Sequence, residues 1–257
     1  MNDTNDLALQ FETLAKLRPE PASRGDGNRP GLGQTLRAVA PLPRGALFLG
    51  VAEDGLPVLL NLEDPVPGPL LVAGDSGSGK TLLLRTVAEA IAATYDADSV
   101  RFAVLADTAS EWENASTAPN CEGILAFQQP LTANYVGSLV HWAHTNQRGR
   151  DYVVLLIDGL ESLQADPSLH QWIRWLLLRG PARRIWPIVT VKATRAASVA
   201  DWLPSFRTRL CGHIAPDRDL ALITGPTDAH FDGLQKGSQF AMREGRGWLP
   251  FWLPAVD

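Results

Sequence analysis

The chain lacks the features that mark several classes of protein. Its 257 residues include two cysteines, Cys121 and Cys211, which are too few for a disulfide framework or a structural zinc site. No apolar run approaches the roughly 20 residues that cross a bilayer, so we expect no membrane insertion and a cytoplasmic location. Lysine and arginine number 23 against 28 aspartates and glutamates, a net charge of −5. Any contact with DNA must therefore come from a local basic patch.

The first 45 residues differ in pattern from the rest of the chain. Within residues 5–18, apolar side chains recur at helical spacing, at Leu7, Phe11, Leu14 and Leu17. This pattern predicts an amphipathic helix that packs on its own domain, on a partner or on a neighbouring copy. Residues 19–45 are rich in proline and glycine and lack apolar periodicity, which is typical of a linker or a loose arm. We expect a helix and arm over residues 1–45 and a folded domain over residues 46–257.

Beyond residue 45, strand and helix patterns alternate. Strands are expected at residues 46–51, 57–62, 70–73, 100–106, 123–127, 152–157, 188–192, 209–214 and 220–224, and helices after residue 81 and at residues 131–145, 168–178 and 196–203. This alternation predicts an α/β fold, with a mostly parallel central sheet and helices on both faces. Residues 237–254 read as two further strands, which predict an antiparallel β extension of that sheet.

One motif carries clear chemistry, and it lies between an expected strand and an expected helix. Its residues are Gly74, Asp75, Ser76, Gly77, Ser78, Gly79, Lys80 and Thr81, which match the phosphate-binding loop G-x-x-x-x-G-K-[ST]. The glycines let backbone N–H groups curl around a phosphate, and the following helix points its positive end at the same anion. Lys80 would reach the β- and γ-phosphates, and the Thr81 hydroxyl would bind Mg²⁺. The motif therefore predicts binding of ATP with Mg²⁺.

A second candidate group is the acid that ends the apolar run over residues 152–157. Asp158 is placed where open α/β sheets bind their ligands, and it would orient Mg²⁺ as a Walker B aspartate. The alternative is that Asp158 only caps the turn made with Gly159. Hydrolysis also needs a group that activates water, and Glu161 is the nearest acid. Glu161 either swings into the site from this turn or lies exposed at the start of a helix.

Taken together, residues 47–254 resemble the motor domain of FtsK/HerA-type DNA translocases, which are RecA-like P-loop ATPases. Besides the phosphate loop, the stretch over residues 50–58 is similar to the family's G-x-D-…-G-x-P-V pattern. Ala106-Asp107 followed by Glu111 is similar to D-P-K-…-E-L. Later stretches at residues 183–195, 203–210, 220–225 and 234–240 match further family motifs in the same order.

The resemblance implies a RecA-like fold and an oligomer, often a hexameric ring, with ATP at subunit boundaries and double-stranded DNA in the central hole. It makes Arg209 a candidate for stabilising phosphate charge in a neighbouring site, with a surface salt bridge as the alternative role. Thr194 falls where the family has a catalytic glutamine. The family's glutamate after the Walker B aspartate is Gly159 here, and its lysine in D-P-K is Ala109.

These departures leave more than one function open. The first is an ATPase that converts ATP and water to ADP and phosphate and moves DNA. The second is a nucleotide-binding subunit with weak or no hydrolysis, which assembles with copies of itself, with a related ATPase or with a secretion complex. A small P-loop kinase is a weaker third reading, because no arginine-rich lid segment follows. The missing glutamate favours the second function.

A basic segment over residues 170–210 favours the first function. It holds Arg174, Arg179, Arg183, Arg184, Lys192, Arg195, Arg207 and Arg209, against the single acid Asp201. These residues would line a DNA channel through phosphate contacts or form a subunit interface. Tryptophans lie in the same segment, at Trp172, Trp175, Trp186 and Trp202. They would either stack on bases or pack in the core.

Overall fold

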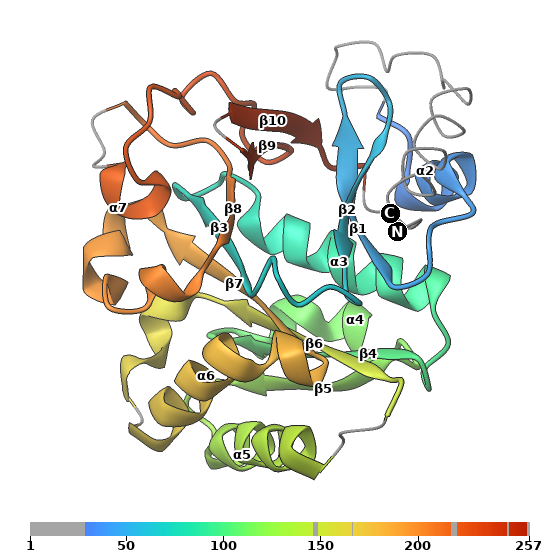
Figure 1. Cartoon of the computed structure of the whole chain (residues 1–257), viewed down its shortest axis with the longest axis vertical. Helices are drawn as coiled ribbons and strands as arrows, with labels where there is room; N and C mark the ends of the chain where they lie inside the picture. The colour runs from blue at the N-terminus through green and yellow to red at the C-terminus, as the bar shows by residue number, and fades with distance from the viewer. Residues whose placement is uncertain (1–28, 146–148, 166, 217–219, 246, 256–257) are drawn as a thin grey trace, which may run out of the picture.

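The computed structural model describes residues 29–145, 149–165, 167–216, 220–245 and 247–255. The helix predicted for residues 5–18 lies outside this part of the chain. The described strands form one sheet of ten, in the order β2-β1-β10-β9-β8-β3-β7-β6-β4-β5 (Figure 1). The predicted α/β fold with a mostly parallel sheet is confirmed.

The parallel half of the sheet contains the strands that alternate with helices. Its strands are β3 (Leu70–Gly74), β4 (Val100–Ala106), β5 (Cys121–Ala126), β6 (Tyr152–Asp158), β7 (Ile185–Lys192) and β8 (Thr208–Cys211). The β3 strand pairs in parallel with β7 and β8, and β6 pairs in parallel with β4 and β7. Side chains of β3 and β6 are buried almost throughout, because helices cover both faces. The β7 strand thus lies between the strand that leads into the phosphate loop and the strand that ends at Asp158.

The antiparallel half is the extension that the sequence predicted. Its strands are β1 (Ala46–Ala52), β2 (Pro57–Asn61), β9 (Gln239–Glu244) and β10 (Gly247–Trp252). The β1–β2 and β9–β10 pairs are antiparallel hairpins, β10 pairs with β1, and β9 joins them to the parallel half through β8.

Helices cover the two faces of the sheet and define two cores (Figure 1). Alternate residues of β3 enter different cores, because side chains of a strand point to opposite faces in turn. Leu70 and Val72 pack with α3 (Lys80–Thr94), while Leu71 and Ala73 belong to the core that contains α5 (Pro130–Thr145) and α6 (Pro167–Arg179). The short α4 (Glu113–Ser116) follows β4. No helix within the described ranges is long and apolar enough to span a bilayer.

Three local predictions were wrong. The proline-rich arm contains a helix, α2 (Leu32–Val39), whose Leu32 and Leu36 are buried against the domain. Residues 220–224 were expected as a strand but contain α7 (Ala221–Thr224), because a four-residue apolar run has no periodicity that separates helix from strand. The helix expected at residues 196–203 is instead two 3₁₀ segments, Ala193–Val199 and Leu203–Ser205.

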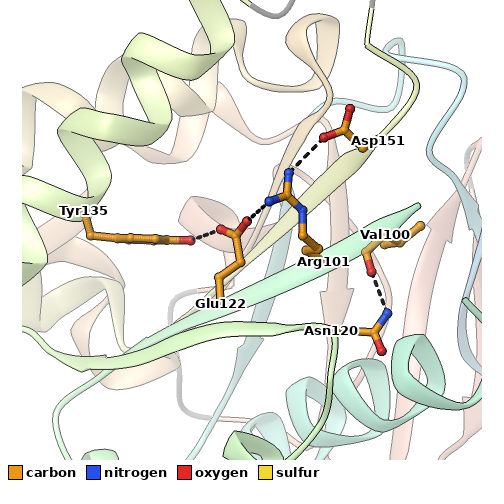
Figure 2. Close-up of polar contacts among 6 residues, drawn as sticks. All are labelled: Val100, Arg101, Asn120, Glu122, Tyr135 and Asp151. Atoms are coloured by element: carbon orange, nitrogen blue, oxygen red, sulfur yellow. Dashed lines mark hydrogen bonds and ion pairs between the residues drawn. The ribbon is translucent and has the colours of Figure 1, made fainter. Parts of the chain in front are cut away.

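A polar cluster fastens the amino ends of β4 and β5 to α5 (Figure 2). The Arg101 guanidinium lies 2.5 Å from a Glu122 carboxylate oxygen and 2.9 Å from an Asp151 oxygen. The Tyr135 hydroxyl of α5 donates to the other oxygen of Glu122. Burial, followed by the nearby Glu122 charge, raises the pKa of Tyr135. Since the cluster lies at the amino ends of the strands, it is at the opposite edge from Asp158 and has a structural role.

Candidate nucleotide-binding site

The phosphate loop connects β3 to α3, and its glycines are required by its backbone. Gly77 and Gly79 have positive φ angles of 74° and 95°. A Cβ atom on Gly79 would lie 2.6 Å from the carbonyl oxygen of Gly237, so no side chain fits there. No side chain caps the start of α3, and its first-turn N–H groups have no partner within the helix. This is a backbone cradle of the kind that binds phosphate.

Lys80 is buried within this loop. Its ammonium group donates to the carbonyl oxygens of Gly74 at 3.0 Å and Asp75 at 2.8 Å, and lies 3.4 Å from the Ser78 hydroxyl. Burial lowers the pKa of Lys80, while the carboxylates of Glu161, Asp158 and Asp75 raise it and the charge of Lys192 lowers it. Lys80 is therefore at the centre of a small group of charges.

Thr81, at the start of α3, is in contact with Asp158, the last residue of β6. The Thr81 hydroxyl donates to one carboxylate oxygen of Asp158 at 2.8 Å, and the buried Thr190 hydroxyl of β7 donates to the other oxygen at 2.8 Å. Hydroxyl and carboxylate oxygens at a helix start suit Mg²⁺, a hard cation that keeps water and phosphate oxygens as further ligands. Among the described residues, no group of three or more His, Cys, Asp or Glu side chains forms an alternative metal site.

The sequence alone does not single out Thr190. Its position becomes meaningful only through the register of β7 against β6, in which Val189 is level with Ile157. The next residues along, Thr190 and Asp158, then lie side by side. The only sequence signal was a polar residue in an otherwise apolar strand.

Glu161 is brought to the site by a turn at Gly159. Gly159 has a φ of 108°, and the Ser162 N–H donates to its carbonyl oxygen. The Ser162 hydroxyl donates to Asp107 at the end of β4 (2.6 Å). One carboxylate oxygen of Glu161 accepts a 3.4 Å hydrogen bond from the Lys192 N–H, and the other is buried without a hydrogen-bond partner. The structure therefore groups Glu161 with Lys80 and Asp158.

Comparison with known families identifies the stretch that contains this site. The NACHT domain model matches residues 68–216, which is more than half of the chain and includes the phosphate loop and Asp158. The chain belongs to the NACHT domain family. A comparison with curated proteins found no match.

Solved structures share the fold of this NACHT domain. The cytoplasmic domain of the Thermomonospora curvata type VII secretion ATPase EccC has a TM-score of 0.67 at 17% identity, over 85% of this chain and 28% of that chain. EssC (ATPases 2 and 3) from Geobacillus thermodenitrificans has a TM-score of 0.70 at 12% identity, over 93% of this chain and 48% of that chain. The pCW3 conjugation coupling protein TcpA, in a monomer form with ATPγS, has a TM-score of 0.63 at 15% identity, over 84% of this chain and 68% of that chain. The chain thus spans about a quarter of the EccC chain and about half of the EssC chain. The likeness confirms the predicted RecA-like P-loop fold.

Two of the predicted site residues, Thr194 and Arg209, make no hydrogen bond to Lys80, Thr81 or Asp158. The Thr194 side chain is exposed on the 3₁₀ segment after β7, with no hydrogen bond to the described residues. The Arg209 guanidinium donates to backbone carbonyl oxygens of its own chain, at Leu203, Phe206, Leu222 and Ile223. Burial lowers the pKa of Arg209. A role for Arg209 in a neighbouring subunit stays a prediction.

The basic segment is divided between structural and exposed residues. Arg184 lies over the ring of Tyr152, and Arg209 is bound as described above. Arg174, Arg179, Lys192, Arg195 and Arg207 are exposed. Trp186 and Trp202 are buried, while Trp172 and Trp175 pack partly buried against the core. The packing role of the tryptophans is therefore confirmed.

Proposed function

We propose that the chain is a Mg²⁺-dependent, ATP-binding subunit with slow hydrolysis, which assembles with copies of itself or with a related ATPase in a cytoplasmic translocation or secretion complex. The observation that supports this most strongly is the hydrogen-bonded group of Thr81, Asp158 and Thr190 beside a glycine cradle with a buried lysine. A phosphate cradle and an oxygen-donor pair together make a site for a nucleotide with its cation.

In this proposal each residue of the candidate site has a separate role. Residues 74–81 bind the phosphates, and Lys80 exchanges its loop carbonyls for phosphate oxygens. Thr81 and Asp158 hold Mg²⁺, with Thr190 fixing the carboxylate. Bound Mg²⁺ supplies charge neutralisation for the phosphates. Glu161 orients the attacking water, because one of its carboxylate oxygens is buried without a hydrogen-bond partner, its charge acts on Lys80, and the usual glutamate is absent at Gly159.

We prefer a role in secretion for two reasons, which are the position of the acid in the site and the similarity in fold to a secretion ATPase. An acid displaced from its usual position suits slow turnover. One relative in fold is named as a type VII secretion ATPase, and another T. curvata EccC structure is described in complex with a signal sequence peptide. We therefore include a peptide as a partner of this chain in the proposal.

A DNA motor is the second candidate, and the exposed arginines favour it. Arg174, Arg179, Arg195 and Arg207 carry side chains free to meet solvent in a chain with net charge −5. One relative in fold is a conjugation coupling protein. Sequence-independent contacts of such arginines to phosphates would make turnover depend on DNA and on salt.

The test is ATP hydrolysis by the purified chain, with and without linear double-stranded DNA, beside Lys80→Ala and Glu161→Gln. We expect slow turnover that DNA does not change, loss of nucleotide binding in Lys80→Ala, and loss of turnover with binding retained in Glu161→Gln. DNA stimulation that Lys80→Ala abolishes would favour the motor. Unchanged nucleotide affinity in Lys80→Ala would refute the assignment of the loop.

A further inference from the structure

Lys192 ends β7, at the edge of the sheet where the phosphate loop begins. In the parallel pairing of β3 and β7, Lys192 is level with Gly74, the first residue of the loop. Two residues earlier, the Thr190 side chain points to Asp158. Because side chains two apart on a strand share a face, Lys192 leaves β7 on the same face as Thr190. The register therefore directs Lys192 towards the site of Lys80, Thr81 and Asp158.

The surroundings of Lys192 leave its ammonium group available. Its side chain is exposed, and it makes no hydrogen bond or ion pair with the residues that the structure describes. Its backbone N–H, by contrast, is bound to the Glu161 carboxylate. Its charge acts on Lys80, whose pKa is lowered first by burial and then also by Lys192. A second cation thus lies within electrostatic reach of the first.

A second cation beside Lys80 would meet the charge of the terminal phosphate. The guanidinium of Arg209, the other candidate cation, is bound to four backbone carbonyl oxygens of its own chain. A nucleoside triphosphate brings more negative charge than a diphosphate, and that extra charge lies at its terminal phosphate. The chain has four lysines, and two of them, Lys80 and Lys192, lie at this site. The other two are Lys16 and Lys236.

We propose that Lys192 is a second phosphate-binding residue, which contacts the terminal phosphate of a bound nucleoside triphosphate and makes the site prefer the triphosphate to the diphosphate. This inference rests on the proposed nucleotide binding and adds a specificity-determining residue to it. In this arrangement the same residue touches nucleotide with its side chain and Glu161 with its backbone. Loss of the terminal phosphate would therefore remove the contact of the Lys192 ammonium group, next to Glu161, the acid proposed to orient water.

The test measures binding rather than turnover. Dissociation constants for Mg-ATPγS and Mg-ADP would be determined by calorimetry on the full chain, for the wild type, Lys192→Ala, Lys192→Arg and Arg37→Ala. Arg37 is an exposed cation on α2, so its variant removes the same charge away from the site. Lys192→Ala keeps the backbone N–H that binds Glu161, so only the ammonium contact is lost. Melting without nucleotide checks that each variant folds.

We expect Lys192→Ala to weaken ATPγS binding about 10- to 100-fold, the loss typical of one hydrogen bond to a charged group, and to change ADP binding less than about threefold. Lys192→Arg should restore most of the preference, and Arg37→Ala should leave both affinities unchanged. Equal losses for the two nucleotides, or no loss, would overturn the role of Lys192 while leaving the proposed function intact. A wild type that binds neither nucleotide would refute both.

Discussion

Gly159 shows why the usual catalytic glutamate cannot simply be restored at its usual position. Its φ of 108° belongs to a region that side chains with a Cβ rarely adopt. The turn that needs this conformation carries Glu161 to Lys192 and ties Ser162 to Asp107. Under the proposed function, the glycine and the backbone turn are two parts of one arrangement, in which Glu161 supplies the acid from two residues further along.

We predict that Gly159→Glu destabilises the chain by about 1–3 kcal/mol, the usual cost of a strained backbone position, and does not speed hydrolysis. Denaturant unfolding and steady-state turnover would measure the two effects. Gly33→Glu is the matched control, because Gly33 is exposed in α2 and a Cβ there meets nothing within 4 Å. A stable Gly159→Glu variant with faster turnover would contradict the relocation of the acid to Glu161.

Much of the site could be predicted from residues alone, because the phosphate loop is local in sequence. Lys80 and Thr81 follow from spacing, and Asp158 follows from an acid at the end of an apolar strand. Thr190 and Lys192 could not be assigned in the same way, because their meaning depends on β7 lying between β3 and β6. For Arg209, the sequence pattern gave no sign that its guanidinium donates to backbone carbonyl oxygens of its own chain.

At the scale of elements, long periodic segments were predictable and short ones were not. The helix α3 buries Leu83, Val87 and Ile91 on one face, as its spacing indicated. The α2 helix was missed because prolines and glycines flank it, and its burial comes from contact with distant residues such as Phe48. Local composition is therefore a poor predictor of secondary structure in a segment that tertiary contacts stabilise.

The end of α3 provides a test of pH dependence. Tyr95 follows the helix, and its hydroxyl donates to the Ala46 carbonyl oxygen of β1 at 2.9 Å. Burial, and then the Glu63 charge, raises the pKa of Tyr95 from 10.0 to about 12. The folded state thus favours the neutral phenol, so the stability it contributes is complete below pH 10 and is lost as pH rises towards 12.

Tyr95→Phe should accordingly lower the free energy of unfolding by about 0.5–1.5 kcal/mol at pH 7, the value of one hydrogen bond. The difference from the wild type should shrink between pH 10 and 12. Urea unfolding at a series of pH values measures this, and the other tyrosines cancel because both proteins carry them. A difference that grows with pH would contradict the assignment.

For the whole molecule, the expected consequence of nucleotide binding is assembly. The site opens at the carboxyl edge of the parallel strands, where Lys192 and Arg195 are exposed. Sedimentation should show a mass increase for the wild type with Mg-ATPγS, and none for Lys80→Ala. A monomer under both conditions would contradict self-assembly and leave a related ATPase as the partner to search for.

The contact between Gly79 and Gly237 joins the two halves of the molecule mechanically. The phosphate loop has no room to expand on that side, so an outward movement would push the segment that leads into β9. The β9 strand is hydrogen-bonded to β10, and β10 to β1, so the displacement would cross the antiparallel strands towards the outer strand β2. A movement of the loop on nucleotide binding would therefore also move the hairpins, and a neighbour that contacts the β1–β2 hairpin would respond to the occupancy of the loop.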